Sequence, residues 1–320
     1  PISVRWVEVN KGDDEHPKIR SRLVAREIRM AGEDAIFAPT PPLESLRMVL
    51  SYAVTDFPNE PRKIFDPVSP ARSHVLLIDI SRAYFNAVTP EDEPTFVELP
   101  PEFGAPPGTC ALLKRHMYGT RRAADGWQSE YSSALIAMGF VQGSASACVF
   151  RHPTRHIVVS VHGDDFTFLG KAKELENIKN LMSSWYSLKV RGVLGPEKND
   201  DKNITILGRE LSWGVCGLEY EADRKHATMI IEAMGLDERS KGLSCPYDKS
   251  EQPEDEGDDM SKAEATELRA LAARANFLAL DRLDIQFAVK ELCRSMSSPK
   301  QGSWGSLKRL ARYLLEKPRG

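Results

Sequence analysis

Cysteine is scarce in this 320-residue chain, and its five cysteines form no CxxC pair. An odd number of widely spaced cysteines argues against a disulfide framework and a zinc site, so we expect a reducing compartment. No apolar run approaches the ~20 residues that a membrane-spanning helix needs, and no signal peptide is recognisable. Because the first residue is Pro1 rather than Met, we expect a fragment of a longer chain.

A surplus of positive charge is also missing, since 43 lysines and arginines face 46 acids and the net charge is −3. The chain as a whole therefore lacks the basic signature of many nucleic-acid-binding proteins. The charge is nevertheless uneven, because residues 286–320 contain eight Lys and Arg but only two acids. The acidic stretch 251–259 is typical of a flexible loop.

The apolar residues, 41% of the chain with tyrosine and tryptophan counted, suffice for sizeable cores. Strand-like runs dominate up to about residue 220, whereas the rest has helical periodicity. The predicted helices cover residues 42–55, 121–140, 171–190, 224–236, 261–280, 284–296 and 303–317. A proline-rich surface loop is predicted over 56–71, and strands over 204–213 and 217–222. We therefore expect an α+β fold with a mixed domain, 1–220, and a helical domain, 221–320.

Residues 157–170, IVVSVHGDDFTFLG, place two adjacent carboxylates in a predicted hairpin turn. β-Branched and aromatic residues favour strands on both sides, and Gly163 followed by Asp164 favours a tight turn. One interpretation is a solvated acidic turn, because Gly-Asp turns are common. The other is a site where a cation neutralises Asp164 and Asp165, since burying carboxylates otherwise costs free energy. The neighbouring His162 is either a ligand or a structural residue of the turn.

A third carboxylate, Asp79, lies near the end of the apolar strand predicted over residues 75–80. It is either a strand-end cap or a metal ligand. If this strand and the hairpin are neighbours in one sheet, Asp79 converges with Asp164 and Asp165. Such a cluster is unfavourable unless divalent cations bind it. Two such ions suit phosphoryl transfer, and Mg²⁺ fits a nucleotidyl transferase acting on a nucleoside triphosphate. A metal-dependent phosphohydrolase or nuclease is a weaker alternative.

Three cations, Lys18, Arg20 and Arg22, share one side of a strand predicted near the N-terminus. A basic strand face is usually just solvated. Three cations within five residues also suit a polyphosphate or a nucleic-acid backbone.

Seven segments, in this order, resemble motifs of the reverse transcriptase of copia-type long-terminal-repeat retrotransposons. They are KIRSRLVAREI, DAIFAPTPPLESLRMVLSYAV, IDISRAYFNAV, FVELPPEFG, LLKRHMYGTRRAADGWQ, VHGDDFTFLG and a final segment from ELRALAARANFLAL to SLKRLARYL. Each motif alone is moderately specific, and the shared order is strongly so. The resemblance runs nearly end to end, up to the point where the family's ribonuclease H begins.

The resemblance implies a right-hand polymerase, with fingers and palm in residues 1–220 and a mostly helical thumb or connection region in residues 221–320. The palm would be an antiparallel sheet backed by helices. The basic C-terminal helices would then track the duplex backbone. The catalytic, metal-binding triad would be Asp79, Asp164 and Asp165, with two Mg²⁺ ions or alternatively Mn²⁺. The implied nucleotide-binding residues are Lys18, Arg20, Arg22, Ile80, Tyr84, Tyr118 and Gly119. The implied primer grip is Leu207 and Gly208.

The implied activity is RNA-directed DNA polymerisation on an RNA or DNA template with a primer and deoxynucleoside triphosphates. The ring of Tyr84 would lie under the incoming sugar and leave no room for a ribose 2′-OH. The expected setting is a larger Gag-Pol polyprotein in a cytoplasmic virus-like particle, in the nucleus, or in both, without a membrane.

Four departures from the family pattern favour an alternative, a catalytically decayed copy that acts at most as a nucleic-acid-binding module. The Tyr-Val that precedes the paired acids in the family is His162-Gly163 here. The family's Ala-Pro-Arg is Ala123-Ala124-Asp125, which replaces a cation by an anion. Two family glycines are replaced by Ala87 and Glu27.

Overall fold

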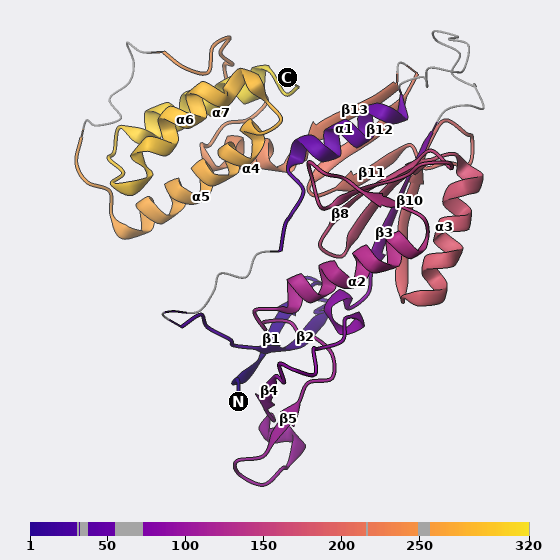
Figure 1. The fold of residues 1–320 in the computed structure, drawn as a ribbon. Coiled ribbons are helices and arrows are strands. Elements are labelled where there is room, and N and C mark those ends of the chain that lie inside the picture. Colours follow the sequence, from indigo (N-terminus) through magenta and orange to yellow (C-terminus); the bar gives the residue numbers. More distant parts are fainter. Residues whose placement is uncertain (31, 33–37, 55–72, 216, 249–256, 320) are drawn as a thin grey trace. The chain divides into compact units, whose positions relative to one another are not determined.

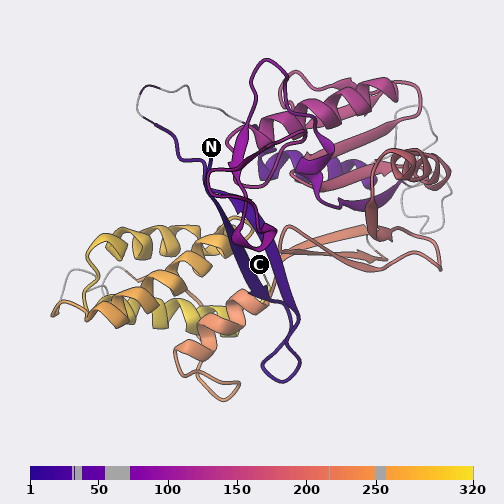
Figure 2. The same ribbon diagram turned by 90° about the horizontal axis from the view of Figure 1, so that it is seen from below.

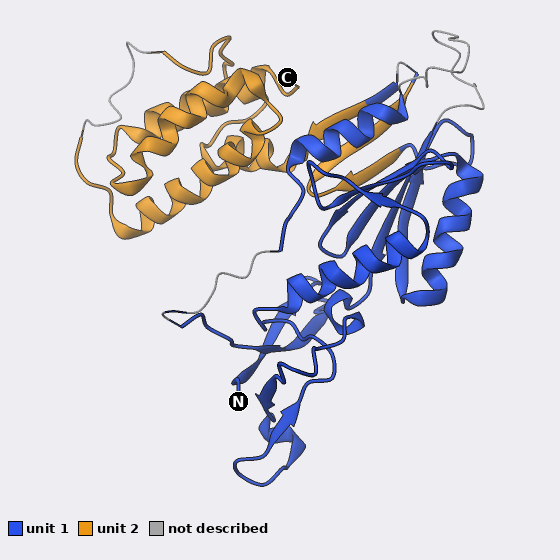
Figure 3. Cartoon of the chain, in the orientation of Figure 1, with its two compact units in different colours: residues 1–202, 215–218 blue, residues 203–214, 219–320 orange. Residues whose placement is uncertain are grey.

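The structure is a computed structural model that describes residues 1–30, 32, 38–54, 73–215, 217–248 and 257–319 (Figure 1). The proline-rich loop predicted over 56–71 lies outside the described residues, as does most of the acidic stretch 251–259. The chain divides into two compact units, residues 1–202 with 215–218, and residues 203–214 with 219–320 (Figure 3). This division differs from the expected one at residue 220 because two strands after residue 202 belong with the helical unit.

The first unit is built on a six-stranded sheet with the strand order β10-β3-β9-β8-β7-β6. All neighbouring strands are antiparallel. The strands are β3 (His74–Ile80), β6 (Val141–Gln142), β7 (Val149–His152), β8 (Ile157–His162), β9 (Asp165–Gly170) and β10 (Leu188–Leu194). The expected α+β class with antiparallel sheets is therefore confirmed, and the predicted strand and hairpin are neighbours.

Helices cover both faces of this sheet, which explains why its central strands are apolar throughout. On one face, α2 (Ala123–Ala137) and α3 (Ala172–Trp185) share a buried core with β3, β8 and β9. On the other face, α1 (Leu43–Ala53) contacts β3, β8 and β9. Successive side chains along a strand point to opposite faces of the sheet. In β3 the successive residues Leu76 and Leu77 are both buried, so both faces are covered there.

The helix predicted over 171–190 is wrong at its C-terminal end. The helix α3 ends at Trp185, and Leu188 begins β10, which pairs with β3 along its whole length. The edge of β3 would otherwise expose unpaired backbone groups. Strand pairing with a distant segment therefore overrides the local helical pattern.

Two small antiparallel ribbons complete the first unit (Figure 2). One joins β1 (Val4–Asn10) to β2 (Ile19–Ala25), and the other joins β4 (Phe96–Glu98) to β5 (Cys110–Leu112). Ile2 forms a parallel bridge with Val97, which links the two ribbons. Short 3₁₀ helices follow β3 and β4, at η1 (Ala83–Asn86) and η2 (Pro101–Phe103).

The second unit combines most of a three-stranded sheet with a helical core. The sheet contains β11 (Asn203–Ile206), β12 (Arg209–Gly214) and β13 (Gly217–Ala222). The helices are α4 (Lys225–Ala233), α5 (Lys262–Ala279), α6 (Gln286–Arg294) and α7 (Ser303–Glu316), with the 3₁₀ helices η4 (Leu283–Ile285) and η5 (Ser295–Ser297). The predicted strand 204–213 is thus two strands joined by a turn. None of the helices in the described residues is long and apolar enough to cross a membrane.

Candidate active site

Three carboxylates from two adjacent strands meet at one end of the large sheet. Asp79 on β3 is directly opposite Asp165 on β9, and Asp164 lies in the preceding turn. One carboxylate oxygen from each acid lies within 4.8 Å of those of the other two. The backbone N–H of Ile80 donates a hydrogen bond of 2.9 Å to the carbonyl oxygen of Asp164. The antiparallel register therefore brings together three acids that the sequence separates by 85 residues.

The turn that presents Asp164 depends on a glycine and on a tryptophan from a helix. His162 pairs with Asp165, which leaves Gly163 and Asp164 as a two-residue turn. Gly163 has a φ of +66°, whereas Asp164 has no positive φ, the pattern of a type II′ turn. The indole Nε1–H of Trp127 on α2 donates a hydrogen bond of 2.8 Å to the Gly163 carbonyl oxygen. This hydrogen bond from the helix thereby holds the turn in place.

Arg191 on β10 contacts two of the three acids. Its Nη2 lies 2.7 Å from Asp79 Oδ1 and 3.3 Å from Asp165 Oδ1. The ladder between β10 and β3 shifts its register between Val190 and Gly192, so Arg191 lies in a β-bulge. A bulge redirects a side chain, and here it accompanies a guanidinium placed at the acid cluster.

The cluster has more negative than positive charge. Burial is the largest effect on the pKa of Asp165 and raises it, and the charges of Asp164 and Asp79 raise this pKa further. Arg191 and His162 act in the opposite direction, yet the pKa of Asp165 stays above its ordinary value. One guanidinium thus only partly compensates three carboxylates, an arrangement that attracts a further cation.

Two tyrosines lie beside the acid cluster. Tyr84 on η1 and Tyr118 have ring centroids 4.7 Å apart, and both rings are partly buried. Burial raises the pKa of each phenol, and the negative charge of Asp164 raises both further. Phe85 contacts the edge of Tyr118. The two tyrosines predicted to touch the nucleotide therefore form one aromatic surface next to Asp164.

The predicted cations on β2 differ in their relation to this surface. The positive charges of Arg22 and Arg20 act on the Tyr118 hydroxyl and oppose the increase of its pKa. Lys18 precedes β2 and is exposed, and its backbone N–H donates a hydrogen bond of 2.9 Å to Asn10 Oδ1. Arg22 and Arg20 therefore act on Tyr118, whereas Lys18 lies before the strand and is exposed.

Gly119 allows the end of β2 to approach the Tyr118 loop closely. The Ala25 N–H donates to the Tyr118 carbonyl oxygen at 2.8 Å. A Cβ on Gly119 would lie only 2.0 Å from the Ala25 carbonyl oxygen, and its φ is +87°. Any larger residue would clash here. Gly119 therefore lets the ribbon of β1 and β2, the basic ribbon that carries Arg20 and Arg22, lie close to the aromatic surface.

The predicted primer-grip residues belong to the second unit. Leu207 and Gly208 form the two-residue turn between β11 and β12, with φ values of +48° and +73°, as in a type I′ turn. A positive φ is strained for leucine. Arg209 Nη1 donates to the Leu207 carbonyl oxygen at 2.7 Å, and Arg209 Nε lies 3.0 Å from Asp281 Oδ2. Asp281 lies two residues after the end of α5, so its buried ion pair with Arg209 connects this segment to the strained turn and supports it.

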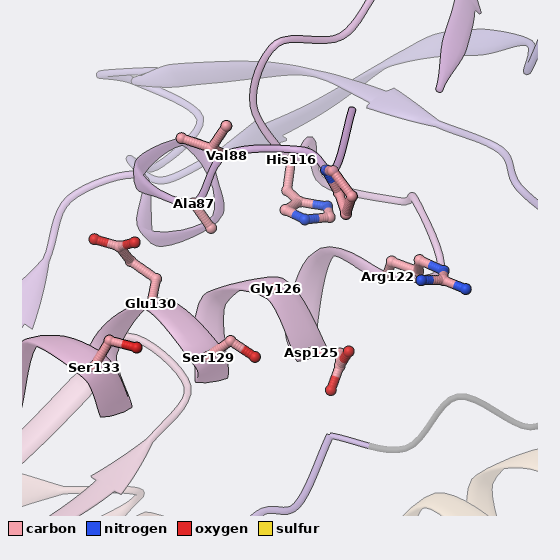
Figure 4. Close-up of a pocket in the computed structure, with 10 residues that line it drawn as sticks. Ala87, Val88, His116, Arg122, Asp125, Gly126, Ser129, Glu130 and Ser133 are labelled. Atoms are coloured by element: carbon pink, nitrogen blue, oxygen red, sulfur yellow. The ribbon is translucent and has the colours of Figure 1, made fainter. Parts of the chain in front are cut away.

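The departures at Glu27 and Asp125 are accommodated by local contacts. Glu27 Oε2 accepts a hydrogen bond of 2.7 Å from the Arg121 backbone N–H. Asp125 lines a polar pocket beside α2 together with His116 and Arg122 (Figure 4). Burial lowers the pKa of His116, Asp125 raises it and Arg122 lowers it, with a net decrease. None of the residues that line this pocket is among the clustered acids.

Sequence reasoning missed two residues of the site. Arg191 was not singled out because residues up to Val190 were assigned to a helix, although a glycine within a strand-like run, Gly192, is a sign of a bulge. Trp127 lies within the helix predicted over 121–140, and it is only 1% exposed. Its hydrogen bond to the turn could not be read from periodicity, which identifies a buried face but no specific polar partner.

Comparisons with known proteins identify the family. Residues 1–198 match the model of the family described as reverse transcriptase (RNA-dependent DNA polymerase). Two relatives from Arabidopsis thaliana are the retrovirus-related Pol polyproteins from transposons RE2 and RE1. They are 25% and 24% identical to the chain over 99% of its length. The chain spans 20% of the length of each.

These matches confirm the resemblance to copia-type elements that the seven ordered motifs indicated. The matched region contains the acid cluster, the aromatic surface, the basic ribbon and Arg191. The chain belongs to the reverse transcriptase (RNA-dependent DNA polymerase) family.

Proposed function

We propose that the chain is an RNA-directed DNA polymerase that joins deoxynucleotides by two-metal nucleotidyl transfer. The observation that supports this most directly is the convergence of Asp79, Asp164 and Asp165 within 4.8 Å. Oxygen ligands of this kind suit Mg²⁺, with Mn²⁺ as an alternative. Among the described residues, one arginine contacts two of the three carboxylates, so their surplus charge also fits cation binding.

In this proposal Asp79, Asp164 and Asp165 hold two ions. When bound, the ions would stabilise the attacking and leaving oxygens of the nucleotidyl transfer. Arg22 and Arg20 bind the triphosphate, and the Ile80 backbone faces it. Tyr118 and Gly119 line the nucleotide pocket. The residues of the chain thus bind and orient the substrates.

Selection of deoxynucleotides is proposed for Tyr84. Its ring packs against Tyr118 at 4.7 Å, which restricts its movement. A rigid ring under the sugar leaves no room for a 2′-OH. The steric exclusion works only if the ring cannot rotate away, and the contact with Tyr118 provides that support.

The remaining parts follow from the same proposal. The first unit contains fingers and palm, the helices of the second unit form a thumb or connection region, and Leu207 with Gly208 forms the primer grip. Partners are an RNA or DNA template with its primer. The relatives' names suggest that the chain is one part of a longer Pol polyprotein, which would act in a cytoplasmic particle, in the nucleus, or in both.

Primer extension on an RNA template with Mg²⁺ tests the proposal. We expect the chain to extend a labelled DNA primer and the D164N variant to lose extension. D125N is the matched control, because Asp125 is an acid in the same unit that lies outside the cluster. Equal extension by D164N and the parent chain would refute the role of the triad.

A second candidate is a decayed copy that binds nucleic acid without catalysis. His162, which stands where the family has a tyrosine, favours this candidate. Its buried Nδ1 has no hydrogen-bond partner in the described part of the chain, and an unsatisfied buried polar atom costs free energy. A chain that extends no primer but shifts labelled duplex in a gel would establish this second candidate.

A further inference from the structure

A guanidinium nitrogen of Arg191 occupies the space between two of the three clustered carboxylates. The same atom, Nη2, lies 2.7 Å from Asp79 Oδ1 and 3.3 Å from Asp165 Oδ1. A divalent cation held by the cluster would draw on the same two carboxylates. Arg191 is thus a cation of the chain itself placed where an ion would bind.

We propose that Arg191 competes with divalent cations for Asp79 and Asp165, so that an ion enters only when the arginine leaves. This inference rests on the proposed function of the triad, because it concerns the same carboxylates. It adds a residue that sets metal affinity and that stabilises the protein when no ion is bound.

The strand geometry allows the arginine to leave. Arg191 lies in the bulge of β10, and its side chain is 46% exposed, so water is available to the released guanidinium. The two acids are partly buried, with side chains 24% and 28% exposed. An arginine has a long, flexible stem. Its departure therefore requires side-chain rotation and no change in strand pairing.

The energetics also fit an exchange. Two carboxylates near a third repel one another when no cation is present. Arg191 relieves this repulsion through its contacts with Asp79 and Asp165. A guanidinium group stays charged at neutral pH. A divalent ion provides twice the charge to the same carboxylates. The arginine thus reduces the repulsion among the carboxylates when no metal is bound, and a cation of higher charge displaces it.

Lys189 offers a matched control on the same strand. It is the ladder partner of Asp79, two residues from Arg191. Among the described residues it forms no ion pair within 4.0 Å of the acids, in contrast to Arg191. Replacing Lys189 removes the same charge from the same neighbourhood without removing the direct contact. A comparison of K189Q with R191Q therefore separates contact from general electrostatics.

Mn²⁺ binding, measured by electron paramagnetic resonance on the whole chain, tests the competition without any assay of catalysis. We expect R191Q to bind Mn²⁺ about 2- to 5-fold more tightly than the parent chain, as expected when a partly exposed ion pair is lost. K189Q should change the affinity by a smaller factor. Without metal, R191Q should have a lower Tm than the parent chain, and saturating Mn²⁺ should reduce this difference.

A second measurement needs no variant. Phenylglyoxal modifies free guanidinium groups, and peptide mass spectrometry can follow Arg191 alone. We expect Mn²⁺ to increase the rate of modification of Arg191 in the parent chain. An unchanged or slower rate would overturn the proposal.

The outcomes also separate this inference from the proposed function. Equal Mn²⁺ affinity in R191Q and the parent chain would overturn the competition, while the metal site itself would stand. Weaker binding in R191Q would overturn it as well, because the arginine would then support the ion. If neither protein binds Mn²⁺, both the competition and the metal site are refuted.

Discussion

The indole of Trp127 and the carbonyl oxygen of Gly163 are joined by a hydrogen bond of 2.8 Å, which ties helix α2 to the turn that presents Asp164. The Trp127 ring also contacts Tyr131, Phe166 and Tyr186 edge-on. One side chain therefore belongs to the hydrophobic core and to the support of the acid cluster.

Replacement of Trp127 by phenylalanine should weaken the fold and the activity together. The lost hydrogen bond contributes about 1 kcal/mol to the free energy of unfolding, and the smaller ring leaves a void that adds to this loss. Urea unfolding should show the decrease, and primer extension should slow. W185F is the control, because Trp185 is 44% exposed. An unchanged extension rate in W127F would show that the turn needs no support from α2.

Removal of the Tyr84 ring should relax the choice of sugar. We expect Y84A to incorporate ribonucleotides on the order of tenfold more readily relative to deoxynucleotides, because steric exclusion is lost. Single-nucleotide incorporation with each substrate measures this ratio. F85A is the control, since Phe85 contacts Tyr118 but is not the proposed gate. A similar change of the ratio in both variants would contradict the assignment.

The cations of β2 should contribute unequally to triphosphate binding. Arg22 and Arg20 lower the pKa of Tyr118, whereas Lys18 lies before β2 and is exposed. We expect R22Q to raise the KM for deoxynucleotides about tenfold, as expected for the loss of a charge-assisted hydrogen bond. K18Q should have a smaller effect. Steady-state extension kinetics decide the matter, and a larger effect of K18Q would reverse the assignment.

The buried ion pair between Arg209 and Asp281 should dominate the stability of the turn at Leu207. The side chains are only 6% and 2% exposed. Truncation of one partner leaves an uncompensated buried charge, so R209M should lower the free energy of unfolding by about 3–5 kcal/mol. The double variant R209M/D281L should recover part of this loss. Urea unfolding measures both.

A surface ion pair in the same unit provides the comparison. Arg319 pairs with Glu221 at 3.2 Å, but its side chain is 57% exposed. R319Q should change the free energy of unfolding by less than about 1 kcal/mol, because water screens exposed pairs. If R209M were no more destabilising than R319Q, the buried pair would not support the turn.

His226 should make the second unit less stable in mild acid. Burial lowers the pKa of His226, Asp223 raises it, and Lys225, Arg274 and Arg209 lower it, with a net decrease below 6.5. The folded state therefore binds fewer protons than the unfolded state. The stabilising contribution is fully present above pH 6.5 and is lost as the pH falls through the lowered pKa of the folded state.

Thermal unfolding between pH 8 and pH 5 measures this effect. H226F should reduce the fall of Tm with pH, because the ring contact with Phe277, at a centroid distance of 4.7 Å, can remain while the titrating group is gone. H16Q is the control, since the His16 side chain is 81% exposed. A pH dependence that H226F leaves unchanged would place the titrating group elsewhere.

Most of the helices and strands followed from local patterns. The helix predicted over 42–55 is α1, and its buried face consists of Leu46, Val49, Leu50 and Ala53, which have helical spacing. The β8–β9 hairpin follows from its apolar runs and its Gly-Asp turn. Errors occurred where a distant partner decided the structure. Residues after Trp185 became a strand because β3 offered a free edge. The division of residues 204–213 has a local cause instead, because Leu207 adopts a positive φ that leucine does not favour.

The sequence alone determined the family, the three acids, the tyrosines and the basic strand, because residue types and their order are visible in one dimension. Only the tertiary structure decided that Asp79 faces Asp165, that Arg191 lies between them and that Trp127 supports the turn. The register of β3 with β9 and the bulge of β10 fix these contacts. Such features depend on pairing between segments far apart in the chain, which local propensity does not encode.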